Sequence, residues 1–90
     1  MSVNVPPPPP PGGSQTTLSW SPSTTAGVVG YKIYIGTASG VYTQSVDVGN
    51  VTTYSVGGLT SGVVYYFAVT AYGANGNESA YSNEVTRTAL

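Results

Sequence analysis

The 90-residue sequence contains no cysteine and no histidine. It can therefore form no disulfide or thiolate metal site, and it lacks the usual thiol nucleophile and general base of enzymes. Charge is scarce as well, because the basic residues are Lys32 and Arg87 and the acidic ones are Asp47, Glu78 and Glu84. Two cations cannot form a basic patch, which argues strongly against duplex nucleic acid or an anionic membrane as a partner.

Only 6% of the residues are charged, so solubility must come from serine, threonine, asparagine and exposed backbone. Such a surface has little electrostatic repulsion between molecules, and self-association stays open. Long apolar runs are also missing, since no segment approaches the ~20 apolar residues of a membrane-spanning helix. The N-terminus lacks a positive region followed by an apolar run. We therefore expect no membrane insertion, and any secretion signal must lie outside this chain.

The remaining polar residues give little support for catalysis or metal binding. Glycoside hydrolysis needs two carboxyl groups roughly 5–9 Å apart across a cleft, and Glu78 and Glu84 are the only acidic pair close in sequence. Asp47 is isolated, and the loop with Asn75 and Asn77 lacks the clustered carboxylates of calcium sites. We interpret the acids as solvated surface groups, and we predict no catalytic residue, no metal site and no cofactor.

Composition divides the chain into a proline-rich arm at residues 1–13, a domain at 14–88 and a short tail at 89–90. The arm is interpreted as a semi-rigid spacer, as an edge-covering or inter-subunit segment, or as a ligand for a proline-recognising domain. The candidate edge or assembly segment consists of Val3, Val5, Pro6, Pro7, Pro8, Pro9, Pro10 and Pro11.

Residues 14–88 alternate between apolar and polar side chains with a period of two. This alternation is clearest at 16–20, 31–35 and 65–72, where valine, isoleucine, threonine and tyrosine are common. Glycine, asparagine, serine and proline stand between the alternating runs, as in turns. The pattern predicts an all-β domain, and no segment shows a sustained helical period.

The run from Gly58 to Val69 carries a more specific signal. Leu59 is spaced to close a sandwich, Gly62 to make a tight turn, and Tyr65 to open an alternating strand. In a tyrosine corner the phenol hydrogen-bonds to backbone a few residues upstream and closes one end of a two-sheet sandwich. We predict this device here, with Trp20 in the core.

Residues 14–88 resemble a fibronectin type III domain, in the form common in secreted bacterial proteins. The similarity rests on 18–20, 30–34, 59–65, 67–72 and 79–88, in that order and spacing. It implies a seven-stranded immunoglobulin-like β-sandwich with one three-stranded and one four-stranded sheet. The family supplies spacers, adhesion surfaces and binding modules, so the resemblance implies an extracellular or cell-surface location and no chemistry.

The first strand departs from the family pattern, because Pro6 to Pro11 occupy its usual place. Proline cannot donate to a β-ladder and is confined to sheet edges. The fold prediction therefore includes an abnormal, proline-rich first strand. That strand is missing, displaced to Val3–Val5, or replaced by a polyproline II segment.

The alternation also assigns side chains to the two faces of the sheets. The predicted core consists of Leu18, Trp20, Tyr31, Ile33, Tyr54, Leu59, Tyr65, Phe67 and Val69. Tyr34, Tyr66 and Tyr72 are predicted to point outward on neighbouring strands. Such a surface either packs across the strands, contacts a partner protein or stacks on sugar rings.

The functional prediction is a non-catalytic extracellular module that acts as a spacer or protein-interaction domain. A first alternative is a self-assembling structural subunit of an extracellular filament or surface layer, joined through an open sheet edge and the proline arm. A second alternative is a weak carbohydrate-binding module that uses the outward tyrosines. The expected partners are neighbouring domains, copies of the chain or a carbohydrate.

Overall fold

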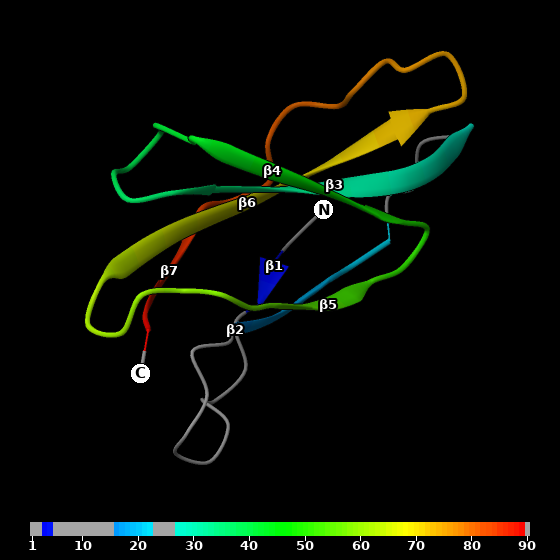
Figure 1. The fold of residues 1–90 in the computed structure, drawn as a ribbon. Coiled ribbons are helices and arrows are strands. Elements are labelled where there is room, and N and C mark those ends of the chain that lie inside the picture. The colour runs from blue at the N-terminus through cyan, green and yellow to red at the C-terminus, as the bar shows by residue number, and fades with distance from the viewer. Residues whose placement is uncertain (1–2, 5–15, 23–26, 90) are drawn as a thin grey trace.

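A computed structural model describes residues 3–4, 16–22 and 27–89, and these residues form a sandwich of two β-sheets (Figure 1). One sheet has the order β1-β2-β5 and the other has the order β4-β3-β6-β7. Within the described residues, no helix is long and apolar enough to cross a membrane. The strands are β1 (Val3–Asn4), β2 (Thr16–Trp20), β3 (Val28–Gly36), β4 (Gln44–Gly49), β5 (Thr53–Val56), β6 (Val64–Gly73) and β7 (Val85–Thr88).

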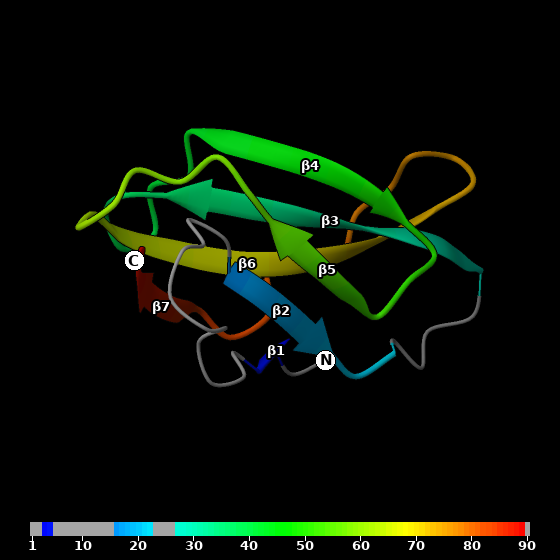
Figure 2. The ribbon, with the colours of Figure 1, turned by 60° about the horizontal axis from the view of Figure 1, so that its bottom comes forward.

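Six strands of four to ten residues, β2 to β7, carry the sandwich. Figure 2 shows β2 and β5 lying across the four-stranded sheet. β1 is much shorter, with Val3 opposite Trp20 and Asn4 opposite Ser19. Val5 and the six prolines lie outside the described residues, so the proline-rich first strand and the count of seven full strands stay predictions.

The core lies between the two sheets, where the inward faces of β2, β3 and β6 meet. Trp20 from one sheet packs against Tyr31 from the other, with ring centroids 5.8 Å apart. Tyr65 is partly buried and packs against the core. Ile35 and Val56 also belong to the core, although the predicted core did not include them. The other predicted core residues that are buried are Leu18, Ile33, Leu59, Phe67 and Val69.

The placement of Tyr54 in the core is wrong, because this residue is 38% exposed. Tyr54 stands opposite Leu18 in the β2–β5 pairing and so belongs to the inward side of its sheet. β5, however, is the edge strand of the three-stranded sheet. Among the described residues no further strand of that sheet pairs with the free edge of β5, and the ring of Tyr54 is left at the rim of the sandwich.

The predicted tyrosine corner is present at the end of the sandwich where β6 begins. The backbone N–H of Thr60 donates to the hydroxyl of Tyr65 at 2.9 Å. Gly62 has φ = 84°, a conformation that glycine adopts at little steric cost. Leu59 is buried beneath this turn, and Ala89 exchanges backbone hydrogen bonds with Gly62 and Val63. The corner therefore ties the end of the chain to the β5–β6 connection.

Replacement of Trp20 by alanine is expected to destabilise the domain by about 3–5 kcal/mol, the range for truncating a buried large aromatic side chain. Reversible urea unfolding of the full chain measures the loss. The matched control is Tyr54→Ala, which removes an exposed ring and is expected to cost no more than about 0.5–1 kcal/mol. Equal midpoint shifts for the two variants would contradict this description of the core.

Replacement of Tyr65 by phenylalanine is expected to cost about 1 kcal/mol, because it removes the acceptor of the Thr60 N–H but keeps the ring. The next residue provides the control, since the hydroxyl of Tyr66 has no hydrogen-bond partner among the described residues. Tyr66→Phe is therefore expected to leave the urea midpoint nearly unchanged. A neutral Tyr65→Phe would show that the corner contributes little to stability.

Candidate functional site

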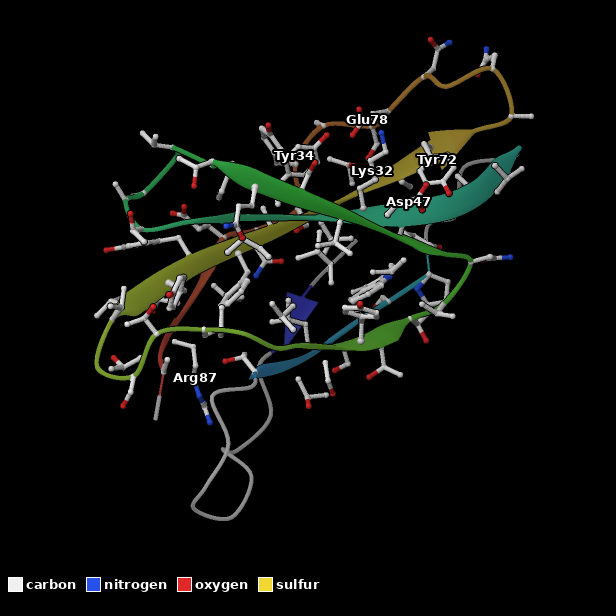
Figure 3. All side chains as sticks on the ribbon, in the orientation of Figure 1. Lys32, Tyr34, Asp47, Tyr72, Glu78 and Arg87 are labelled. Carbon is white, nitrogen blue, oxygen red and sulfur yellow. The ribbon has the colours of Figure 1, made fainter. Side chains whose placement is uncertain are left out.

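The outer face of the four-stranded sheet, the side turned away from the three-stranded sheet, carries a dense group of polar and aromatic side chains. Figure 3 shows Lys32, Tyr34, Asp47, Tyr72 and Glu78 gathered on this side. They come from β3, β4, β6 and the connection between β6 and β7. The outer face is therefore the candidate functional surface.

The three tyrosines predicted for this surface lie at separate positions along the sheet. Tyr34 lies opposite Ala68, whereas Tyr66 and Tyr72 lie opposite Gly36 and Gly30 at other positions along β3. In the described part of the chain, the ring of Tyr34 contacts Tyr42 and Tyr81 but neither Tyr66 nor Tyr72. Each of the three instead has its own surroundings, and only Tyr34 belongs to a group of aromatic rings.

Tyr72 crosses the sheet from β6 to β4. Its hydroxyl donates to Oδ1 of Asp47 at 2.7 Å, and Lys32 Nζ lies 5.7 Å from its ring centroid. The ring can take this path because Gly30 has no side chain, and a Cβ there would meet the phenol. The hydrogen bond to Asp47 raises the pKa of Tyr72 and lowers the pKa of the carboxyl group. Tyr72 therefore links three adjacent strands.

Residues 78–84, here called the strap, run beside β6 without forming a regular strand. The backbone N–H groups of Ser79 and Ser82 donate to the carbonyls of Ala71 and Val69 at 2.7 and 2.9 Å. In return, the two serine hydroxyls accept from the N–H groups of Ala71 and Val69 at 3.0 and 2.9 Å. Serine side chains thus replace backbone carbonyls in the ladder, and residues between them are free to bulge outward.

Glu78 anchors the first end of the strap. Its Oε1 accepts from the hydroxyl of Tyr34 at 2.5 Å and from the hydroxyl of Thr70 at 2.8 Å. Its Oε2 lies 3.7 Å from Nζ of Lys32. The bond from Tyr34 is the main reason why the pKa of Glu78 is lowered, and the same bond raises the pKa of Tyr34 to about 12.

Glu84 anchors the second end of the strap to the β3–β4 turn. It accepts from the Ser39 hydroxyl at 2.6 Å, from the Gly40 N–H at 2.9 Å and from the Tyr42 hydroxyl at 2.9 Å. The bond from Ser39 is the largest cause of the lowered pKa of Glu84. Burial, followed by the bond to Glu84, raises the pKa of Tyr42 to about 12.

Three rings meet between these anchors and form the tyrosine cluster (Tyr34, Tyr42 and Tyr81). Tyr81 lies 5.1 Å from each of the other two rings, edge-on to Tyr34 at 81° and tilted by 57° to Tyr42. Tyr34 and Tyr42 are 6.2 Å apart. No two rings are coplanar and all are in contact, so the cluster encloses no cage for a ligand. Tyr81 nevertheless remains 55% exposed.

The sequence analysis missed Tyr42 and Tyr81 because both lie outside the alternating runs. It also described Glu78 and Glu84 as solvated surface groups, whereas both accept hydrogen bonds from residues more than 40 positions away in the chain. One signal was available. Ser79 and Ser82 stand on either side of Tyr81 in the sequence. Glu78 directly precedes the first serine, and Glu84 follows the second serine by two positions.

The carboxylates are arranged as structural anchors. Each of the three acidic residues accepts at least two hydrogen bonds from other residues of the chain, as Asp47 does from Tyr72 and Gly49. Among the described residues no three metal-ligating side chains gather. An open depression of about 600 Å³ lies beside Tyr72, between Val28 and the loop with Asn75 and Asn77. Of the three acidic residues, only Glu78 lines this depression.

Two facing sheets closed by a tyrosine corner define an immunoglobulin-like sandwich domain. A family model for the fibronectin type III domain matches residues 10–88. The chain therefore belongs to the fibronectin type III domain family, as its resemblance predicted. Domains of this family are generally non-catalytic accessory modules.

Similar stretches occur in larger proteins. The chain is 42% identical over 66 residues to a Kelch domain-containing protein, SSO1033, of Saccharolobus solfataricus. It is 42% identical over 74 residues to chitinase A1 of Niallia circulans and 46% identical over 70 residues to amylopullulanase of Thermoanaerobacter thermohydrosulfuricus. The matches include 73%, 81% and 76% of the chain but 9%, 10% and 4% of the relatives. The chain thus spans a tenth or less of these relatives.

The fold also matches solved structures. An Fn3-like protein from Clostridium thermocellum aligns with a TM-score of 0.65 and 28% identity, over 82% of this chain and 75% of that one. A fibronectin type III domain derived from the human KIAA0970 protein aligns with a TM-score of 0.73 over 99% of this chain, at 22% identity and over 73% of that chain. The second likeness is one of fold alone.

Tyr34 and Tyr42 are expected to ionise near pH 12, well above the ordinary pKa of about 10. Because the folded pKa is raised, the two phenols stabilise the fold below pH 10, and this contribution is lost as the pH rises towards 12. Tyrosinate absorbance of the native chain measures the late phase. Glu84→Gln removes the negative acceptor, so the Tyr42 phase is expected to move to lower pH.

The control for this titration is Tyr66→Phe, which removes a phenol outside the cluster. It is expected to leave the late phase intact. A single transition near pH 10 in the wild type, with circular dichroism showing a folded chain, would contradict the anchoring of the cluster.

Proposed function

We propose that the chain is a non-catalytic accessory module of an extracellular multidomain protein, in which it acts as a spacer or a protein-interaction domain. Its membership of the fibronectin type III family supports this role. So does the small share that the matching stretches take up in the chitinase and the amylopullulanase. These relatives also support a partnership with domains that act on polysaccharides outside the cell.

The observation that carries the non-catalytic role is the state of the three carboxylates. The chain has no histidine or cysteine, so the carboxylates of Asp47, Glu78 and Glu84 are the first candidates for acid–base chemistry, beside lysine, tyrosine and hydroxyl groups. All three are instead occupied by hydrogen bonds from the chain itself. These bonds hold their pKa values down, whereas a general acid at neutral pH needs a raised pKa.

We further propose that β1, which lies within the arm at residues 1–13, represents the first strand of the family, shortened to two residues and paired with the domain at 14–88. The pairing of Val3 with Trp20 supports this assignment. The alternative of self-assembly draws support from β4 and β5, which are edge strands of the two sheets, and from the 40% exposure of Val51 in the turn that joins them. Unpaired sheet edges are sites where further strands add.

The test combines an activity assay with a measurement of molecular mass. The full chain is expected to release no reducing sugar from chitin or pullulan, and light scattering is expected to show a monomer from micromolar to millimolar concentration. Hydrolysis that disappears in Glu84→Gln would overturn the non-catalytic role. Growth in mass with concentration, abolished by removing residues 1–13, would favour the structural subunit instead.

A further inference from the structure

We propose that Tyr81 and the β3–β4 turn beside it form a contact site for a neutral polysaccharide. The site is defined by Tyr81, Tyr42, Ser39 and Glu84 and is called the Tyr81 corner. It differs from the surface of Tyr34, Tyr66 and Tyr72 that the alternation predicted. The proposal adds a ligand to the accessory role but does not depend on that role, because it rests on the exposure, contacts and charges of this corner.

The ring of Tyr81 is exposed and yet held in one place. It is 55% exposed, while its contacts with Tyr34 and Tyr42 restrict it on two sides. The strap that carries it is fixed by Glu78 at one end and Glu84 at the other. A ring already ordered in the free protein loses little conformational entropy on binding, which favours its use as an anchor.

The polar groups around Tyr81 offer acceptors. The hydroxyls of Ser39 and Tyr42 donate their protons to Glu84, so each presents lone pairs to solvent. The carboxylate of Glu84 is itself an acceptor. A ligand that complements this corner must therefore bring hydrogen-bond donors, and sugar hydroxyl groups meet that requirement. The C–H face of a pyranose ring would then lie against the aromatic ring.

The charges near the corner select against an anionic ligand. Glu78 and Glu84 hold the two ends of the strap, and Lys32, the nearest cation of the outer face, is paired with Glu78 at 3.7 Å. Arg87 lies away from Lys32 and Glu78 (Figure 3). A polyuronate or a phosphorylated glycan would meet carboxylates without a free cation, and its charges would be repelled. A neutral glycan meets no such penalty.

The geometry also predicts how many sugar units of the ligand stack on the protein. Tyr34 and Tyr42 are tilted by 81° and 57° to Tyr81, so no second ring extends the plane on which a sugar could stack. One sugar unit therefore stacks on Tyr81, and neighbouring units add weak contacts. Such a site suits a polymer, which offers many equivalent positions.

Affinity electrophoresis of the full chain tests the proposal, with pullulan and a soluble chitin derivative as neutral probes and polygalacturonate as the anionic probe. The wild type is expected to be retarded by at least one neutral polymer and not by polygalacturonate. Tyr81→Ala is expected to weaken the association about tenfold, the change that follows from losing one stacking contact. Tyr81→Phe, which keeps the ring, is expected to bind as the wild type does.

Tyr54→Ala is the matched control, because it removes an exposed tyrosine from the opposite sheet. It is expected to leave the retardation unchanged, and urea midpoints show that each variant is folded. Added salt is also expected to have no effect, since no ion pair with the ligand is involved. Absence of retardation by both neutral polymers, equal losses in Tyr81→Ala and Tyr54→Ala, or binding to polygalacturonate alone would overturn the proposal. Hydrolysis of chitin or pullulan would overturn the proposed accessory role but would not change the outcome of this binding test.

Discussion

The contact between Trp20 and Tyr31 is the interaction on which the rest of the structure depends. These rings come from different sheets and pack 5.8 Å apart at an angle of 58°. A domain of this size has little core, and this one has no disulfide to supplement it. The burial of Leu18, Ile33 and Phe67 around the pair therefore has to hold the two sheets together. Every side chain of the outer face is placed by a sheet that this interior positions.

Much of this interior could be predicted, because strand alternation is a local property. Side chains two positions apart share a face, so Trp20 and Leu18, or Phe67 and Val69, identify the inward side wherever a strand is long enough. The tyrosine corner is local as well, since Tyr65 and Thr60 are five residues apart. Tyr54 shows the limit of the pattern. Alternation identifies the face of a side chain, but whether another strand covers that face depends on strand order, which the pattern does not contain.

The outer face was harder to predict because its contacts join distant parts of the chain. Tyr34 meets Glu78 across 44 positions, and Ser39 meets Glu84 across 45. Tyr42 and Tyr81 lie in connections outside the regular strands, where no periodicity fixes the direction of a side chain. Their meeting with Tyr34 depends on the register between β3 and β6 and on the path of the strap. The predicted surface of Tyr34, Tyr66 and Tyr72 contained strand residues alone.

The strap also explains why β7 is only four residues long. A regular strand beside Val69 and Ala71 would direct alternate side chains away from the outer face. Serine hydroxyls instead take over as acceptors for these two N–H groups, and the backbone between them can leave the ladder. This arrangement gives the backbone N–H groups of β6 the hydrogen-bond partners that buried backbone requires. It also prevents a further strand from pairing with this part of the β6 edge. It also brings Tyr81 over the sheet, where the two carboxylates hold the segment in place. Because the two carboxylates of the strap serve as anchors, the exposed aromatic ring of Tyr81 is the main feature that the strap presents to a partner.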